Sequence, residues 1–510
     1  MARKFYITTP IFYVNDLLHI GHAYCTIACD VVARFKRWAG YEVLFLTGTD
    51  EHGQKIAQAA SLKGETPLEW ADYIVSQDKR LWEKLNISHD DFIRTTEDRH
   101  ERTVQAIFTK LYEKGDIYKG EYEGWYCTSC ETFYLESQLD EGRCPECGKV
   151  VEKLKEESYF FRLSKYQKRL LDCFEANPEF VQPPFRKAEM VNFVKEGLRD
   201  LSVSRTAVKW GIPVPFDEKH TVYVWFDALI NYLTACGYLD DKAKFEKFWP
   251  ADVHLVGKEI LKFHTIIWPA MLMALEIPLP KKVFGHGWWT VEGEKMSKSR
   301  GNVVNPVEVS EEFGVDAFRY FLMREVPFGQ DGDFSQKALV RRYNADLANN
   351  LGNLLSRTLT MVEKYLEGRV PEPGREEEEE DRELIQKVNA LFERVIRYYD
   401  KLELNSVLGA IWEVIDYANR YIERLAPWKL EKNDRKRLET VLYNLLETLR
   451  VVTFYILPFM PETAERIWEQ LGIEEKIYNQ KIEEVQWGRL KSGRKIKIGK
   501  PLFPRIKTDL

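Results

Sequence analysis

The stretch Asp16–His22, close to the N-terminus, most restricts what this chain can fold into. It follows the apolar run Phe5–Ile7, a candidate buried strand, and precedes residues with the spacing of one apolar helix face. A turn from a strand into a helix offers free backbone N–H groups and the positive end of the helix dipole, which both attract anions. His19 and His22 are three residues apart, so both imidazoles can face the same anion. Gly21 between them lets a phosphate or a flat ring approach the backbone. The same pattern would also arise if the two histidines only capped the helix.

Strands and helices alternate over roughly the first 120 residues, which is typical of an α/β domain. Residues 42–47 form a candidate buried strand, and the loop after it carries Asp50. Ligands of such sheets bind outside the carboxyl ends of the strands, where Asp50 and the histidine turn both lie. Asp50 could hold an ammonium group or cap the next helix, and the two roles can coexist. Helical patterns follow over residues 67–85 and 99–114.

The α/β pattern returns at about residue 220. We predict a strand over residues 220–225, a helix over 226–232, and a buried strand at Val253–Val256 that ends in Gly257-Lys258-Glu259. The sheet that starts at the N-terminus is therefore expected to be interrupted by an insertion and then completed.

Four cysteines of the insertion have the spacing of a zinc site. Cys127, Cys130, Cys144 and Cys147 form two C-x2-C pairs separated by thirteen residues. Two such knuckles supply four thiolates to one tetrahedral Zn²⁺, whereas disulfides would be unusual in a cytosolic chain. Four protein ligands leave no open position for a substrate, so we expect one structural Zn²⁺ per chain. The remaining cysteines lack ligand spacing and are expected to be small buried residues: Cys25, Cys29, Cys173 and Cys236.

Beyond about residue 336 the pattern becomes continuously helical, with three long apolar stripes between residues 385 and 456 that predict a helical bundle. Asn349, Asn353 and Arg357 recur every four residues along one helix face, and Trp428 stands at a helix end. Amides, a guanidinium and an indole can read and stack on splayed single-stranded bases. A polar helix surface with one capping tryptophan would give the same pattern.

Composition and hydropathy favour a cytoplasmic protein without membrane contact. The longest apolar run, Ile266–Leu275, has ten residues and contains Pro269, whereas a helix that spans a bilayer needs about 20. No signal peptide is recognised before the first strand. The net charge of -6 does not by itself indicate nucleic-acid binding, although eight Lys or Arg lie between Arg489 and Lys507.

A second motif, Gly293–Gly301, decides among the open alternatives. Its two lysines, Lys295 and Lys298, lie in a loop bracketed by glycines. A mobile loop of this kind can close cations over a polyphosphate, although a solvated basic turn would have the same composition. H-I-G-H followed by K-M-S-K-S about 270 residues later resembles the class I aminoacyl-tRNA synthetases. Nearly the whole chain is similar to the methionyl-tRNA synthetase family, through residues 10–15, 47–53, 223–228, 263–264 and 268–270.

The resemblance implies a methionine pocket made of Ile11, Tyr13, Asp50, Trp225, Tyr232, Ile260, Phe263 and His264. In that pocket Asp50 would hold the α-ammonium, aromatic rings would wrap the thioether, and Tyr232 and His264 would lie near the sulfur. The residues implied for ATP binding are His19, Gly21, His22, Glu259, Lys295 and Lys298. Of these, the two histidines and two lysines would be catalytic, and Glu259 would lie near the ribose, where some relatives carry Asp. Mg²⁺ is implied by ATP and not by a motif.

The resemblance also implies that Asn353, Arg357 and Trp428, with Asn349 on the same face, read the CAU anticodon of initiator and elongator tRNA(Met). Many members of the family continue into an oligonucleotide-binding domain that dimerises them. This chain stops first, so we expect a monomer that could use a separate tRNA-binding subunit.

The expected fold is a Rossmann-type parallel-sheet catalytic domain, interrupted by a zinc-binding connective insertion and followed by a C-terminal helical bundle. The expected boundaries are 1–119 and 220–280 for the two halves of the catalytic domain, 120–219 for the insertion, 281–340 for the K-M-S-K-S stem-contact region, 341–475 for the helical anticodon-binding domain and 476–510 for the basic tail.

Three other functions fit parts of the pattern. A synthetase for leucine, isoleucine or valine would usually carry a large editing insertion, for which 510 residues leave little room. A nucleotidyltransferase with H-x-G-H would be much shorter and would not need a helical RNA-binding domain. A tRNA-binding protein that has lost catalysis is disfavoured, because both histidines and both lysines are present.

Overall fold

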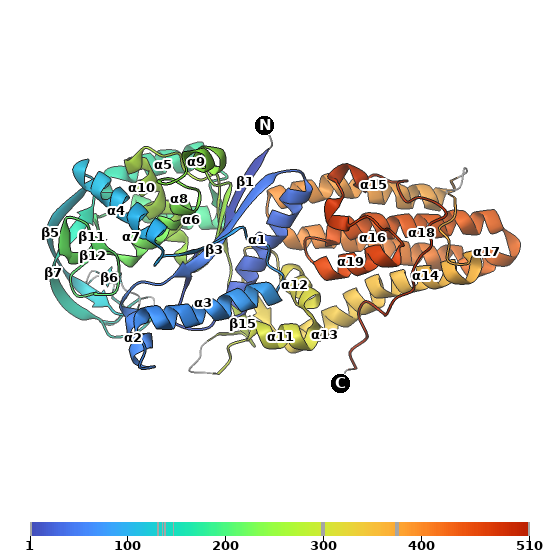
Figure 1. Ribbon diagram of the computed structural model, residues 1–510, viewed down its shortest axis with the longest axis horizontal. Helices are drawn as coiled ribbons and strands as arrows, with labels where there is room; N and C mark the ends of the chain where they lie inside the picture. Colours follow the sequence, from blue (N-terminus) through green and yellow to red (C-terminus); the bar gives the residue numbers. More distant parts are fainter. Residues whose placement is uncertain are drawn as a thin grey trace.

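The computed structural model describes residues 3–129, 132–134, 136, 139–145, 147–296, 301–372 and 377–507. The molecule is elongated, with a half built on β-sheets at one end and a helical half at the other (Figure 1). No helix in the described part of the chain is long and apolar enough to cross a membrane.

The main sheet is parallel throughout, which confirms the Rossmann-type fold predicted from the sequence. Its strands follow the order β2 (Phe12–Tyr13), β3 (Glu42–Asp50), β1 (Lys4–Thr8), β13 (Val253–Gly257), β14 (Val283–His286) and β8 (Val181–Gln182), and β4 (Asp91–Arg94) pairs with β3. The chain segments that form the main sheet also contain α1 (Ile20–Trp38), α2 (Gln54–Ser61), α3 (Pro67–Lys84), α4 (Asp98–Glu113), α9 (Lys242–Phe248) and α10 (Trp268–Leu275). The helices predicted over 67–85 and 99–114 correspond to α3 and α4.

The strand predicted over residues 220–225 is wrong in its second half. Strand β12 (Asp217–Val222) ends at Val222, and it pairs antiparallel with β10 (Ser204–Arg205) and β11 (Pro213–Val214) in a separate small sheet. Helix α7 (Val224–Leu229) begins directly afterwards and is followed by α8 (Asn231–Ala235). A short apolar run has no length or period that separates strand from helix, and packing decided in favour of the helix.

The insertion is built on an antiparallel sheet in the order β6 (Thr132–Tyr134), β5 (Ile117–Cys127), β7 (Glu152–Phe161) and β9 (Leu201–Ser202). Its helices are α5 (Gln167–Ala176) and α6 (Pro184–Lys195). Strand β8, just before α6, joins the edge of the main sheet next to β14. The insertion is therefore tied to the main sheet along part of its length.

The K-M-S-K-S region connects the sheets to the helical half. It contains β15 (Trp289–Val291), β16 (Glu294–Lys295), β17 (Gly332–Phe334), α11 (Pro306–Phe313), α12 (Val315–Arg324) and α13 (Gln336–Arg342). A π-helical segment, Tyr343–Gly352, then leads into the bundle helices α14 (Asn353–Leu366), α15 (Glu379–Asp400), α16 (Leu404–Leu425), α17 (Pro427–Asn433), α18 (Arg435–Ile456) and α19 (Pro461–Gln470). Helix α18 is buried along most of its length. A continuous apolar core joins α1 and part of the main sheet to the bundle.

Candidate active site

A cavity of about 930 Å³ opens where strands β1, β3 and β13 end. This is the edge at which open α/β sheets bind ligands. The cavity is lined by all eight residues that the sequence assigned to a methionine pocket, and by His19, Gly21, His22 and Glu259 of the ATP set. Residues that lie far apart in the sequence, from Ile11 to His264, are thus brought around one space.

The two histidines cap helix α1 and also face the cavity, so both explanations of the H-I-G-H turn hold together. His19 is the N-cap residue, and its Nδ1 accepts a hydrogen bond from the Gly21 backbone N–H at 3.0 Å. Nδ1 of His22 accepts from the His19 backbone N–H at 3.0 Å. A Cβ on Gly21 would lie 2.9 Å from the His19 ring, so glycine is needed for this close approach.

These contacts determine which nitrogen of each imidazole carries the proton. A backbone N–H can only donate, so Nδ1 of both rings must be unprotonated, and in the neutral form Nε2 carries the hydrogen. Burial lowers the pKa of His22 well below its ordinary value, and the neighbouring His19 and His286 lower it further. Burial also lowers the pKa of His19, partly offset by Glu259. At neutral pH the pair therefore offers two neutral N–H donors to an anion.

The apolar part of the cavity is uncharged and walled by aromatic rings. Trp225 and Phe263 stack with centroids 3.8 Å apart. Nδ1–H of His264 donates to the Ile260 carbonyl at 3.0 Å, which leaves Nε2 to accept from the Tyr232 hydroxyl at 2.7 Å. Burial lowers the pKa of His264 to about 4, so this ring is neutral.

A π-helical turn and a buried ion-pair cluster position these aromatic side chains. Phe263 and His264 lie on a π-helical turn, a local widening of the helix that is frequent at functional sites. Trp225 lies on α7, which is anchored by the buried Asp227. That carboxylate pairs with His52 Nδ1 at 2.8 Å and with His100 Nε2 at 2.7 Å.

Asp50 supplies a buried carboxylate at the end of β3, next to the aromatic pocket. It is not the N-cap residue of the following helix, because that position in α2 is held by Gly53, which has no side chain to cap with. The N-cap role that the sequence left open for Asp50 is therefore not realised. A carboxylate beside an uncharged aromatic pocket suits an amino acid with an apolar side chain and a charged amino group.

The part of the cavity around Glu259 also contains residues that the sequence patterns did not indicate. Glu259 accepts from Trp288 Nε1 at 2.6 Å, and Lys258 pairs with Asp331 at 2.6 Å while its Nζ lies 4.2 Å from the Trp288 ring centroid. Cys25, His286 and Met190 also line the cavity. Apart from Lys258 and Glu259, which the sequence pattern placed at the end of a strand, none of these residues belongs to a local motif, so only the fold could show that they meet here.

The K-M-S-K-S stretch reaches this cavity. Glu294 and Lys295 form β16, which pairs with β15, and Met296 lines the cavity. Farther along, the Val304 carbonyl accepts from the backbone N–H of Ile20, at the start of α1. Lys298 and the side chain of Lys295 lie outside the described residues, so their predicted role remains a prediction.

Three of the four predicted zinc ligands form a cluster that could hold a metal ion. The Sγ atoms of Cys127, Cys144 and Cys147 lie within 4.8 Å of one another. Sγ of Cys127 is 3.5 Å from Sγ of Cys147, much longer than the about 2.05 Å of a disulfide. Tetrahedral zinc with Zn–S bonds of about 2.3 Å needs sulfurs about 3.8 Å apart, so the cluster has suitable dimensions. Cys130 lies outside the described residues.

The predicted anticodon residues lie in the helical half, away from the cavity. Asn349 lies on the π-helical segment and Asn353 and Arg357 on α14, and Asn349 and Asn353 are exposed. The Arg357 guanidinium pairs with Glu423 at 3.0 Å. Trp428, 44% exposed, lies on α17, which packs against α14 at the end of the bundle far from the sheets (Figure 1).

Comparison with known proteins agrees with this geometry. A family model described as class I tRNA synthetases (M) matches residues 5–153 and 148–359, and one for the anticodon-binding domain of tRNA ligases matches residues 381–498. The chain is 58% identical to a methionine–tRNA ligase of Caldanaerobacter subterraneus, with 100% of this chain and 80% of the relative covered. It is 49% identical to that of Thermotoga maritima, with coverage of 99% and 80%. The solved structure of Mycobacterium tuberculosis methionyl-tRNA synthetase in complex with methionyl-adenylate is similar, with a TM-score of 0.95, 45% identity, and coverage of 99% of this chain and 100% of that one.

Proposed function

This chain belongs to the methionyl-tRNA synthetase family of class I aminoacyl-tRNA synthetases, and from that premise we propose how its cavity carries out the reaction. The enzyme activates methionine with ATP to give methionyl-adenylate and pyrophosphate, and then transfers methionine to the 3′ end of tRNA(Met). The observation that carries the mechanism is a single cavity lined by a carboxylate, by neutral aromatic side chains and by the two histidines that cap α1.

In the proposed first step, the Asp50 carboxylate holds the methionine ammonium, while the aromatic walls enclose the thioether. Sulfur gains about 0.3–1.5 kcal/mol from each such aromatic contact. A charged side chain would lose its hydration in this uncharged pocket without gaining a partner, so charged amino acids are rejected.

The methionine carboxylate oxygen then attacks the α-phosphorus of ATP, and the bond from that phosphorus to pyrophosphate breaks. We assign the Nε2–H groups of His19 and His22 to the phosphate oxygens, where negative charge builds up in the transition state. The lysines of the K-M-S-K-S loop would close on the pyrophosphate side. Mg²⁺ that accompanies ATP would neutralise phosphate charge, and we assign no residue to it.

The proposal is tested by measuring ATP–pyrophosphate exchange with each of the twenty amino acids. We expect exchange with methionine far above that with leucine, isoleucine or valine, and charging of tRNA(Met). Exchange driven best by another amino acid would overturn the methionine assignment, and charging of tRNA without an exchange activity would overturn the adenylate mechanism.

We further propose that the cysteine cluster binds one structural Zn²⁺, with Cys130 as the fourth ligand. Zinc would fix the end of the β5–β7 arm, part of which also lines the cavity through Cys147. Cys127→Ser should lower the zinc content from about one ion per chain and destabilise the protein by up to about 4 kcal/mol, since loss of a metal is among the costliest single changes. Zinc analysis and thermal unfolding measure both effects.

Cys173→Ser is the matched control, because Cys173 is a half-buried thiol outside the cluster. It should keep full zinc content and stability. Metal-free protein that stays folded with full activity would contradict the structural role of zinc.

We propose that Asn349, Asn353, Arg357 and Trp428 form the surface that reads the CAU anticodon. Trp428→Ala should lower kcat/KM for tRNA charging by about 5- to 150-fold, because stacking of a base on an aromatic ring is worth about 1–3 kcal/mol. ATP–pyrophosphate exchange should stay within about twofold, since the substitution is remote from the cavity. Arg357→Ala should likewise lower tRNA charging and leave exchange nearly unchanged, and it should discriminate less among anticodon variants of the tRNA.

The control for this surface is Glu431→Ala, which changes another exposed residue of the short helix α17. It should leave both activities unchanged. If exchange and charging of Trp428→Ala fell together at normal stability, Trp428 would belong to the active site and the anticodon assignment would be wrong.

A further inference from the structure

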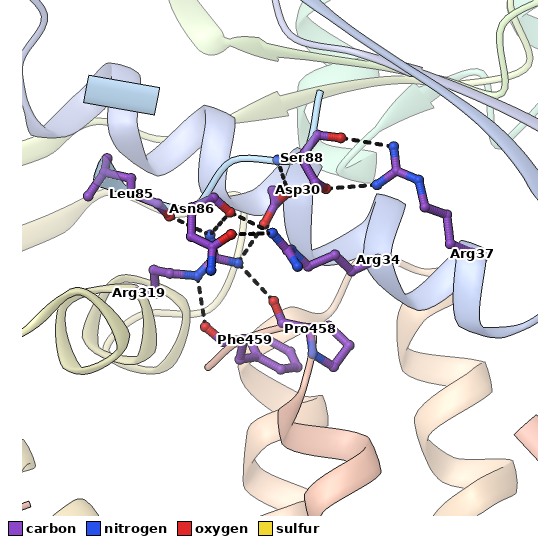
Figure 2. Close-up of polar contacts among 9 residues, drawn as sticks. All are labelled: Asp30, Arg34, Arg37, Leu85, Asn86, Ser88, Arg319, Pro458 and Phe459. Atoms are coloured by element: carbon purple, nitrogen blue, oxygen red, sulfur yellow. Dashed lines mark hydrogen bonds and ion pairs between the residues drawn. The ribbon is translucent and has the colours of Figure 1, made fainter. Parts of the chain in front are cut away.

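A fully buried arginine stands at the junction of the two halves of the molecule. Neither Arg319, on α12, nor Asp30, on α1, exposes any side-chain surface, and Nη2 of Arg319 lies 2.6 Å from Oδ2 of Asp30. The remaining donors of the guanidinium go to backbone carbonyls. Nη1 donates to Leu85 at 3.0 Å, Nη2 also donates to Pro458 at 2.8 Å, and Nε donates to Phe459 at 2.9 Å (Figure 2).

These contacts join three segments that are remote in sequence. Asp30 belongs to the helix that starts at the catalytic histidines, Leu85 follows α3, and Pro458 and Phe459 form the turn between α18 and α19 of the bundle. The planar fork of a guanidinium has donors in fixed directions, so it specifies the relative position of all three.

Both carboxylate oxygens of Asp30 also have hydrogen-bond partners. Oδ1 of Asp30 accepts from the Ser88 N–H at 2.7 Å and the Ser88 hydroxyl at 2.6 Å, and Oδ2 accepts from Arg34 Nε at 2.7 Å. Arg34 continues to Asn86, which also lies in the loop after α3 (Figure 2). Burial opposes ionisation of Asp30, but the two arginines outweigh it and hold the pKa of its carboxyl below the ordinary value.

Stability alone does not account for such a site. Replacing a buried ion pair with apolar residues of similar volume is often neutral or stabilising, because removing two charges from water is costly. The directed hydrogen bonds of the charged site also fix one relative position for the loop after α3, helix α1 and the bundle.

Helix α1 connects this junction to the active site. Asp30 lies eight residues after His22, or about 12 Å along the helix. The C-terminal end of α1 also packs on the bundle: the rings of Phe35 and Tyr399 stack at 3.7 Å, and Lys36 Nζ lies 3.0 Å from Asp400 Oδ1. One rigid element therefore carries the catalytic histidines at one end and contacts the bundle along the rest.

We propose that Arg319 is a positioning residue that holds the helical half at a fixed orientation to α1, so that tRNA bound on the bundle delivers its 3′ end to the adenylate. This inference rests on the proposed function, because it assumes that the bundle binds tRNA. Activation needs only the cavity, which Arg319 does not line. Charging of tRNA also needs the helical half to be held in one orientation relative to the cavity.

The test is Arg319→Lys, which keeps the charge and loses the directed fork. We expect kcat for tRNA charging to fall about 10- to 100-fold, because small misplacements of reacting groups have effects of this size. KM for tRNA should change little, since the bundle surface is intact, and methionine-dependent exchange should stay within about twofold. A double variant, Asp30→Asn with Arg319→Gln, removes both charges of the pair, while Arg34 keeps its hydrogen bonds to Asn86. If the single variant does not fold, the double variant should likewise lower charging and keep exchange.

Arg450→Lys is the matched control. Arg450 is also buried, pairs with Glu447 at 2.7 Å and donates to the carbonyls of Glu484 and Gln486 at 2.7 Å each, but all these contacts lie within the helical half. It should lower thermal stability without separating charging from exchange. All assays are run at a temperature at which every variant is folded.

Equal losses of exchange and charging in Arg319→Lys, or unchanged charging, would overturn the positioning role. The same separation in Arg450→Lys would also overturn it, because any weakened bundle would then suffice. Wild-type exchange and charging are measured in parallel. Their absence would defeat the proposed function itself, whereas their presence without the separation defeats only the role of Arg319.

Discussion

Replacing Lys298 with Ala should lower the rate of methionine-dependent ATP–pyrophosphate exchange by about 10²–10³-fold, with little change in KM for methionine. Removal of one preorganised group aimed at developing charge commonly costs about 2.7–4 kcal/mol. Met296, two residues earlier, lines the cavity, and the chain returns to the start of α1 through Val304. The described residues on either side of the loop thus lie at the cavity and at the start of α1, the helix that begins at His19 and His22. Because the charge develops only in the transition state, the loss should appear in turnover.

Lys242→Ala is the control for charge alone, since Lys242 is a strongly exposed lysine on α9 that does not line the cavity. Its exchange kinetics should match those of the wild type. A Lys298→Ala enzyme that lost methionine affinity but kept its turnover would show that this lysine acts on the amino acid and not on the phosphates.

The opposite kinetic signature is expected for Asp50→Asn. The ammonium of methionine is charged in both the ground state and the transition state, so its partner contributes to both equally. Removing one member of a buried, hydrogen-bonded charge pair costs about 2–5 kcal/mol, so kcat/KM for methionine should fall by roughly 30- to 4000-fold. The loss should appear as a raised KM, with kcat at saturating methionine nearly retained.

Asp78→Asn provides a matched control at another buried carboxyl. Burial, with a smaller effect of Glu51, raises the pKa of Asp78 to about 8. This carboxyl is therefore mostly protonated at neutral pH, and an amide resembles it closely. Asp78→Asn should keep both kcat and KM. If Asp50→Asn instead lowered kcat and left KM unchanged, Asp50 would act in the chemical step and not in holding the ammonium.

Local spacing along the chain by itself determines the family, the fold class and the motifs of this protein. Three of its features are patterns of closely spaced residues: the two C-x2-C pairs, the H-I-G-H turn and the apolar stripes of the bundle. Such patterns can be read from the sequence because the residues that act together are near neighbours along the chain. The family followed from H-I-G-H and K-M-S-K-S together with the segments around Asp50 and Trp225. The parallel sheet, its interruption by an insertion and the helical bundle followed in the same way, and the fold confirms them.

Only the tertiary structure decided what depends on contacts between distant segments. It showed that Nδ1 of both His19 and His22 is occupied by the backbone, that Asp50 is not the N-cap residue of α2, and that Trp225 lies on a helix and not on a strand. It also joined Asp30 to Arg319, 289 positions away, although neither residue belongs to a motif. The physical reason is the same in each case. A sequence pattern fixes which neighbours along the chain can share a face, whereas the partner of a buried donor or charge is fixed by how whole elements pack against one another.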